Sequence, residues 1–260
     1  MTYPTPPSQQ QTVSGTQQHH RPRLQVSLAQ HECEVREAQH LRYKVFSEEM
    51  GARLVCKIPE HDTDLFDPWC DHLLVRDEAS GKVVGTYRIL SPEAAQRVGS
   101  YYSENEFSLT RLQHIRGRMV EIGRSCIHRD YRNGAVIALL WSGLAAYMHR
   151  GGYNYLIGCA SIGMNDGGHN AANIYRQLAD AQQAPLEYRV FPHHPLPFEH
   201  LADGQRAQVP PLLKGYLRAG GLVCGEPAWD PDFNTADLLL MLPMARLSER
   251  YARHFIGPSA

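Results

Sequence analysis

Two charged residues, Glu121 and Arg124, stand within an otherwise strand-like stretch that runs from Met119 to Ile127. A buried strand must provide a partner for each charge it carries, because an isolated ion loses its hydration there. A buried carboxylate is a candidate for acid–base chemistry, and an arginine is a candidate for binding an anion. The alternative is a purely structural ion pair. This stretch is therefore the first candidate for a functional site.

The segments that follow predict a strand–turn–helix–strand unit. A polar turn over 128–133 leads to Gly134 and to a run over 135–147 that is apolar on nearly every face, which is typical of a helix buried on several sides. Gly151 and Gly152 end this helix, and 153–159 predicts the next strand. Such a unit is right-handed and parallel, and the helix's free N–H groups point beyond the end of the first strand.

The register of the first strand raises a difficulty. Strict alternation places Glu121 and Gly123 on one face, and Val120, Ile122 and Arg124 on the other. A β-bulge at Gly123 would bring Arg124 to the side of Glu121, and we predict that bulge. The rival is an unbroken ladder through Gly123.

An upstream helix and loop offer further charges. The pattern over 32–50 predicts an amphipathic helix that ends at Gly51, with Arg42 on its apolar stripe. Arg42 either extends to the surface or is half-buried and needs a carboxylate. The irregular loop over 57–69 carries acids, and a hairpin over 71–90 carries Arg88. We expect acids of this loop to pair with Arg42 and Arg88. The acids of the loop are Glu60, Asp62, Asp64 and Asp67.

Composition bounds the class of protein. With 260 residues, of which 43% are hydrophobic, the chain can bury a substantial core, and we expect residues 1–23 to be a disordered tail and 24–260 to be one domain. The formal net charge of −1 argues against a general nucleic-acid binder. Six cysteines without a CxxC pair indicate reduced thiols in a cytoplasmic protein. The histidines lack zinc spacing, so no metal site is expected, and neither is a signal peptide or membrane span.

Two surface patterns leave alternatives open. The arginines between Arg111 and Arg132 form either a local basic patch for an acidic partner or phosphate, or a solvated rim. The final helix, predicted over 245–255, carries arginines on one face and apolar residues on another. It either contacts an anionic membrane peripherally or packs on its own domain. The arginines of the first pattern are Arg111, Arg116, Arg118, Arg124, Arg129 and Arg132.

The order of predicted elements is that of an α/β fold with a mixed central sheet flanked by helices and an insert before the last strand pair. It resembles the GNAT superfamily of N-acyltransferases. That resemblance implies a splay between the central strand and the next, with a pantetheine arm between them and a phosphate at the turn before the helix. The turn here departs from the usual pattern, because Arg132 stands two residues, not three, before Gly134.

Five longer motifs resemble the bacterial ornithine–acyl carrier protein N-acyltransferases. The resemblance covers residues 24 to the C-terminus. It implies transfer of a 3-hydroxyacyl group from acyl carrier protein to the α-amine of ornithine, the first step of ornithine lipid biosynthesis. The motifs are LRYKVFSEEMGA (41–52), DLFDPWCDHLLV (64–75), GKVVGTYRIL (81–90), EIGRSCIHRDYRNGAVIALLW (121–141) and FNTADLLLMLPMARLSERYARHF (233–255).

The same positions resemble the acyl-homoserine-lactone synthases, a signal-synthase alternative. Those enzymes carry a tryptophan after the first helix, where this chain has Gly-Ala-Arg-Leu at 51–54. A catalytically silent protein that binds acyl carrier protein or membrane is the third alternative. The positions that match the synthases are Arg42, Phe46, Asp64, Asp67, Arg88, Glu121 and Arg124.

The resemblance implies roles for these residues. Glu121 and Arg124 are the expected catalytic pair, with Glu121 as general base and Arg124 on the amino acid's carboxylate. The expected partners are acyl carrier protein and ornithine, without a bound cofactor, because the acyl donor is carried on the carrier's phosphopantetheine. The expected substrate-binding residues are Arg42, Phe46, Asp64, Asp67 and Arg88. The expected phosphopantetheine-binding residues are Arg132, Asn133, Gly134 and Ala135.

Overall fold

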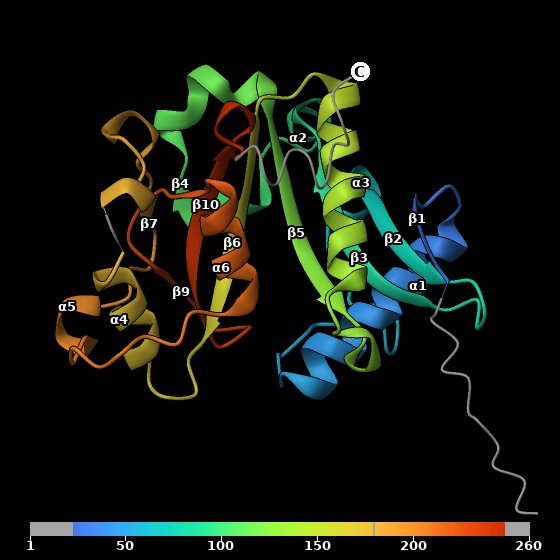
Figure 1. The fold of residues 1–260 in the computed structure, drawn as a ribbon, viewed down its shortest axis with the longest axis horizontal. Helices are drawn as coiled ribbons and strands as arrows, with labels where there is room; N and C mark the ends of the chain where they lie inside the picture. Colours follow the sequence, from blue (N-terminus) through green and yellow to red (C-terminus); the bar gives the residue numbers. More distant parts are fainter. Residues whose placement is uncertain (1–22, 179, 248–260) are drawn as a thin grey trace, which may run out of the picture.

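The computed structural model describes residues 23–178 and 180–247, and these residues build a central mixed sheet with helices on both faces (Figure 1). The strands follow the order β1-β2-β3-β5-β6-β10-β8, and β9 pairs with β10. The predicted α/β fold is confirmed. The strands are β1 (Leu24–Leu28), β2 (Asp71–Asp77), β3 (Val83–Leu90), β5 (Met119–Ile127), β6 (Tyr155–Gly163), β8 (Leu222–Val223), β9 (Ala228–Asp230) and β10 (Thr235–Pro243).

The helices form two layers. One face of the sheet packs against α3, α4 and α6 in a single apolar cluster that contains Leu140, Ile174 and Leu213. The other face packs against α1 and α2 in two smaller clusters. Alternation along the strands divides the apolar side chains between these layers. The helices are α1 (Glu32–Tyr43), α2 (Pro92–Val98), α3 (Ala135–Gly151), α4 (His169–Arg176), α5 (Phe198–Leu201) and α6 (Pro211–Ala219).

The predicted helix over 32–50 exists, but its last part is not α-helical. After α1 the chain continues as a π-helix, η1 (Lys44–Glu49), which ends at Met50. The wider π-turn re-aims side chains relative to a regular helix, and such turns are frequent at functional sites. Phe46 lies in this segment.

The predicted strand–helix–strand unit is confirmed as β5, α3 and β6. The two strands are parallel, and their pairing extends only from Met119↔Tyr155 to Glu121↔Ile157. Beyond these residues the strands diverge, as Figure 1 shows. Gly158 stands where they separate, and a Cβ there would lie 2.5 Å from the Ile122 carbonyl oxygen. The glycine therefore permits the close approach of the strands at the start of the splay.

The predicted bulge exists but is displaced from Gly123. Pairing with β3 continues through Arg88↔Gly123, breaks, and resumes at Thr86↔Cys126, so Arg124 and Ser125 stand opposite one residue, Tyr87. Arg124 has a positive φ of 49°. This backbone conformation is uncommon for residues other than Gly, Asn and Asp. It turns the Arg124 side chain away from the face of the sheet that strict strand alternation would give it.

The C-terminal part completes the site. The residues before the final strands form the short β7 (Phe191–Pro192), which pairs with β4 (Phe107–Ser108), and then α5 and α6. The predicted final strand pair is confirmed by β8 and β10, while β9 is an additional strand. Of the predicted last helix, Met244–Arg246 forms a 3-10 turn, and residues 248–255 lie outside the described residues.

The arginines between Arg111 and Arg132, for which a basic patch and a solvated rim were both considered, fall into two groups. Arg111, Arg116 and Arg118 precede β5, whereas Arg129 and Arg132 follow it. At about 3.3 Å per residue a nine-residue strand separates the two groups by roughly 25 Å. No helix within the described ranges, 23–178 and 180–247, is long and apolar enough to cross a bilayer.

Candidate active site

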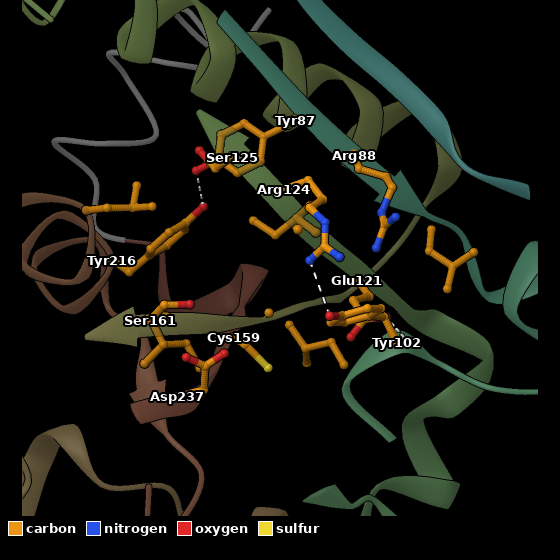
Figure 2. Close-up of a pocket in the computed structure, with 18 of the residues that line it drawn as sticks. Tyr87, Arg88, Tyr102, Glu121, Arg124, Ser125, Cys159, Ser161, Tyr216 and Asp237 are labelled. Carbon is orange, nitrogen blue, oxygen red and sulfur yellow. Dashed lines mark hydrogen bonds between the residues drawn. The ribbon is translucent and has the colours of Figure 1, made fainter. Parts of the chain in front are cut away.

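A cavity of about 250 Å³ opens at the splay of β5 and β6. Its lining includes Phe46, Arg88, Glu121 and Arg124, which were predicted as site residues. Figure 2 shows Arg88, Arg124, Glu121 and Tyr102 on one side of this cavity, with Cys159, Ser161 and Asp237 on the other. The splay removes the backbone hydrogen bonds that would otherwise fill this part of the sheet.

A network of three arginines and three aspartates lies behind one wall of the site, and two of its members, Arg88 and Arg124, line the cavity. Arg42, Asp64 and Asp67, which were also expected to bind substrate, do not line it. Arg42, from α1, is completely buried. Its Nη1 and Nη2 donate to the two carboxylate oxygens of Asp67 at 3.0 and 2.9 Å, and its Nε donates to Asp62 Oδ2 at 2.8 Å. The prediction that a buried Arg42 pairs with the acidic loop is confirmed. We call Arg42, Arg88, Arg124, Asp62, Asp64 and Asp67 the arginine–aspartate network.

The network joins the sheet to the loop. Arg88, on β3, contacts Asp64 and, at 3.1 Å, Asp67. Arg124 makes the longest ion pairs, with Nε 3.2 Å from Asp62 Oδ2 and Nη2 3.4 Å from Asp64 Oδ2. Its guanidinium carbon lies 4.9 Å from the centre of the Tyr102 ring and 4.7 Å from that of Phe233. Arg124 is therefore held by two aromatic rings and only weakly by acids.

The network balances three positive against three negative charges. Burial raises the pKa of Asp67, but Arg42 and Arg88 outweigh this effect and hold the pKa well below its usual range. For Asp64, burial is likewise outweighed, here mainly by Arg88, so its pKa is lowered. These aspartates stay ionised, and their oxygens are occupied by the arginines.

Glu121 is buried in a different way. Its carboxylate accepts hydrogen bonds from the backbone N–H groups of Tyr102, at 2.6 Å, and Ser103, at 2.8 Å. Only 4% of the residue is exposed, and burial raises its pKa more than these donors and Arg88 lower it. It forms no ion pair with Arg124, so the structural pair considered for these two residues is absent among the described residues. Glu121 is an ionisable group at the cavity wall with a raised proton affinity.

Phe46 contributes an apolar contact. Its ring meets that of Phe233 edge-on, with ring centres 5.9 Å apart, and Phe233 in turn covers Arg124. The π-helical turn thus connects α1 to the site through a stack of two rings and one guanidinium.

The turn over Arg132–Ala135 lies at an exposed end of the unit. Arg132 Nη2 donates to Glu49 Oε2 at 2.7 Å, and its Nε donates to the Ile127 carbonyl at 3.0 Å. Asn133 Oδ1 accepts from the Ala135 N–H, and Gly134 has a φ of 93°. These residues surround the start of α3, whose dipole favours an anion there. They do not line the cavity described above.

Several residues that line the cavity were not predicted from the sequence. Tyr102 lies in the short 3-10 segment Tyr102–Asn105, whose sequence has no periodic signal, and Glu106 is the residue directly after this segment. Asp237 carried a usable signal, because it is a lone acid in the apolar strand β10, as Glu121 is in β5. Asp237 and Glu106 both line the cavity.

Comparison with known proteins places the chain within a family. Residues 41–142 match the family model described as an acetyltransferase (GNAT) domain. The L-ornithine N(alpha)-acyltransferase of Brucella abortus (strain 2308) is 35% identical over 252 residues, which cover 89% of this chain and 88% of the relative. The protein of the same name from Agrobacterium fabrum (strain C58 / ATCC 33970) is 36% identical over 251 residues, covering 90% and 85%.

Solved structures share the fold. The AHL synthase LasI superposes with a TM-score of 0.55 at 15% identity, covering 92% of this chain and 98% of its own. The CoA-dependent acyl-homoserine lactone synthase BjaI, with SAM and isopentyl-CoA, gives a TM-score of 0.52 at 14% identity, with 88% and 85% covered. At these identities the likeness establishes a common architecture and nothing about the substrate.

Proposed function

Since the chain belongs to the L-ornithine N(alpha)-acyltransferase family, an assignment that makes it an N-acyltransferase, we propose that it transfers a 3-hydroxyacyl group from acyl carrier protein to the α-amine of ornithine. The observation that carries the proposal is the buried Glu121 at the splay of β5 and β6, inside a cavity that also contains Arg124. The product of this reaction is an acylated ornithine, the lyso form of an ornithine lipid.

Glu121 is the proposed general base. An amine attacks a thioester only when it is neutral, and a free α-amine titrates near ~8 whereas a side-chain ammonium titrates near ~10.4. The α-nitrogen is therefore the easier one to deprotonate. Because burial raises the pKa of Glu121, its carboxylate is a stronger base than an exposed one. It receives the proton directly or through one water molecule.

Arg124 is the proposed partner of the amino acid's carboxylate. Arg42 is completely buried, Arg88 is 4% exposed, and both make short contacts with aspartates. The side chain of Arg124 is 11% exposed and makes the longer contacts described above. A guanidinium between two rings can bind a carboxylate through two parallel N–H groups. Phe46 supports it indirectly through Phe233.

The bulge supplies the proposed oxyanion site. Gly123, Arg124 and Ser125 line the cavity at the point where pairing with β3 is interrupted. Backbone N–H groups released from a ladder are suitable donors for the oxygen that becomes negative during attack. The positive φ of Arg124 fits a backbone held for such a purpose.

The thioester arm is proposed to enter between β5 and β6. Arg132, Asn133, Gly134 and Ala135 would then hold the single phosphodiester of phosphopantetheine at the start of α3. In the reaction the amine nitrogen bonds to the thioester carbon, and the carbon–sulfur bond breaks. The α-ammonium loses two protons on becoming the amide nitrogen. One is released to solvent through Glu121 and the other ends on the departing thiolate, so the products are an amide, the carrier's free thiol and one proton.

The test is thiol release from 3-hydroxyacyl carrier protein with the amino acid varied and the products identified by mass spectrometry. We expect release with ornithine and an amide product. Release with S-adenosylmethionine but with no amino acid would instead assign the chain to the signal synthases. Failure with every acceptor would leave a catalytically silent carrier or membrane protein and would overturn the proposal.

A further inference from the structure

A second group of acids lies in the same cavity. Glu106, Cys159 and Asp237 present ligand atoms that all lie within 4.8 Å of one another. Among the described residues, neither Glu106 nor Asp237 forms an ion pair with a lysine, arginine or histidine, although thirteen other pairs occur. We call Glu106 and Asp237 the carboxyl pair.

The carboxyl pair comes from distant parts of the chain. Glu106 lies just before β4, and Asp237 lies on β10, where it faces Ser161 of the neighbouring β6. Asp237 is only 4% exposed, yet its Oδ1 is buried without a hydrogen-bond partner, as is Oε2 of Glu106. Figure 2 shows Asp237 beside Cys159 and Ser161, facing the side that carries Arg124 and Glu121.

A third acid adds to the negative charge. Asp230, on β9, lines the cavity and acts electrostatically on both members of the carboxyl pair. Burial, followed by Asp237 and Asp230, raises the pKa of Glu106. Burial also raises the pKa of Asp237, by more than the hydroxyls of Thr235 and Ser161 lower it. Glu106 and Asp237 interact with each other but with no cationic side chain among the described residues. Buried acids without a counter-charge are costly, so a cation that enters the cavity would be strongly stabilised.

We propose that Glu106 and Asp237 form the subsite that binds the side-chain ammonium of the acceptor amino acid. The inference rests on the proposed function, since it places the far end of the same substrate. An ammonium has three N–H donors, which suit the two unpartnered carboxylate oxygens and one further acceptor nearby. The acids of the arginine–aspartate network are unsuitable, because arginines already occupy their oxygens.

The spacing along the strands fits a diamine. Glu121 pairs with Ile157, and Cys159, beside the carboxyl pair, stands two residues further along β6, which is about 6.6 Å of strand. The two nitrogens of ornithine are five bonds apart, or roughly 6 Å when extended. An ornithine with its α-amine at Glu121 can therefore reach the carboxyl pair with its other end.

The experiment compares two acceptors that differ only in the ammonium. Norvaline has the carbon skeleton of ornithine without the terminal amine. The wild type, Asp237→Asn and Glu106→Gln are assayed for kcat/KM with each acceptor and the same acyl carrier protein. Asp232→Asn is the matched control, because Asp232 is exposed, lies two residues from Asp230 and does not line the cavity.

We expect the wild type to favour ornithine over norvaline, and Asp237→Asn to lose on the order of 100-fold in kcat/KM for ornithine, as for a buried charge that loses its partner. The kcat/KM of Asp237→Asn for norvaline should change little, so this variant should lose the preference for ornithine over norvaline. Asp232→Asn should keep that preference. A variant that fails to fold would lose both acceptors equally. In that case the affinity of refolded Glu106→Gln for ornithine is measured by calorimetry. Weaker binding than in the wild type supports the subsite, and equally tight binding overturns it.

Three further outcomes distinguish a failure of the ammonium subsite from a failure of the proposed function. Acyl transfer to ornithine with an unchanged preference in both variants would overturn the subsite and leave the proposed function standing. Absence of transfer in the wild type would overturn the function, and ornithine binding that is equally tight in wild type and Asp237→Asn would then overturn the subsite as well. One equivalent of zinc in the purified wild type, lost in Asp237→Asn, would assign the cluster to a metal and overturn the ammonium subsite.

Discussion

Arg88 and Arg124 of the arginine–aspartate network line the same cavity as the carboxyl pair, but among the described residues only the network has its charges matched. In the network each acid meets an arginine, and the pKa values of Asp64 and Asp67 are lowered. In the carboxyl pair no such partner is present among the described residues, and the pKa values of Glu106 and Asp237 are raised. The charges of the first group are neutralised by arginines, whereas those of the second are relieved by protonation or, as proposed, by a bound ammonium.

The difference distinguishes the acids whose charges are matched by arginines from the acids that we propose to bind the substrate. A matched network fixes the loop over 57–69 to α1 and β3 and so places Arg124. An unmatched pair stores a free-energy cost that a cationic substrate relieves on binding. Glu121 stands between these extremes, with two backbone donors and a raised pKa.

The largest expected effect comes from breaking the matched network. Arg42→Met leaves Asp62 and Asp67 short of their buried partner, so we expect a loss of about 3–5 kcal/mol in the free energy of unfolding. Arg42→Lys keeps the charge but loses the bidentate contact with Asp67, so its free energy of unfolding should fall by less. Asp237→Asn, in contrast, removes an unmatched charge and should leave stability unchanged within about 1 kcal/mol or increase it. Urea unfolding measures all three, and similar losses for Arg42→Met and Asp237→Asn would contradict the comparison.

The next effect concerns Glu121. Glu121→Gln keeps the size of the side chain and removes the base, so kcat should fall about 10²–10⁴-fold while ornithine still binds. Because burial raises the pKa of Glu121, the wild-type rate should fall on acidification at a pH above the ordinary range of a glutamate, near ~4.3. Pre-steady-state thiol release as a function of pH measures both. A full rate in Glu121→Gln would exclude it as the base.

The pH dependence of stability distinguishes the two groups of acids. A raised folded-state pKa means that the folded protein binds more protons than the unfolded one between about pH 4 and the raised value. Stability should therefore fall as pH rises through that window, by up to about 1.4 kcal/mol per pH unit for each proton. The groups whose pKa is raised in this way are Glu106 and Asp237, together with Glu121 across the cavity.

Saturating ornithine should abolish this decline, because a bound ammonium keeps the acids ionised. The lowered pKa values of Asp64 and Asp67 act in the opposite direction. The contribution of Asp64 and Asp67 to the free energy of unfolding is present above pH ~4. It is lost only as the pH falls through their lowered pKa values. Chemical unfolding across a pH series, with and without ornithine, measures the difference. An identical slope in wild type and Asp237→Asn would argue against a role for the carboxyl pair.

A charge outside the cavity should matter least. Arg132 is exposed and pairs with Glu49, so Arg132→Ala should raise the KM for acyl carrier protein by about fivefold, equivalent to roughly 1 kcal/mol, without changing kcat. Raising the salt concentration should remove most of the difference. A large fall in kcat would place this turn closer to the reacting atoms than proposed.

The network was predictable from the sequence because its charges interrupt regular patterns. Arg42 interrupts an apolar helical stripe and Arg124 interrupts a strand, so each required a partner. The carboxyl pair was not predicted, since its meeting depends on β10 pairing with β6 and on an irregular segment that carries Glu106. Periodicity specifies which face a residue takes, but it does not specify which strands become neighbours.

Other differences have similar causes. The bulge falls at Arg124 and Ser125 and not at Gly123, because Arg124 itself adopts the positive φ. The basic residues around β5 do not form one patch, since an extended strand separates them. Local patterns therefore identified the elements and the matched charges, while the tertiary arrangement decided the rest.

The position of the new amide bond tests the central claim most directly. Tandem mass spectrometry of the product from 3-hydroxyacyl carrier protein and ornithine distinguishes acylation of the α-nitrogen from acylation of the terminal nitrogen. With the α-amine at Glu121 and the terminal ammonium at the carboxyl pair, we expect an α-amide with a free terminal amine. An amide on the terminal nitrogen would mean that ornithine binds in the opposite orientation, and it would contradict the placement of the α-amine at Glu121.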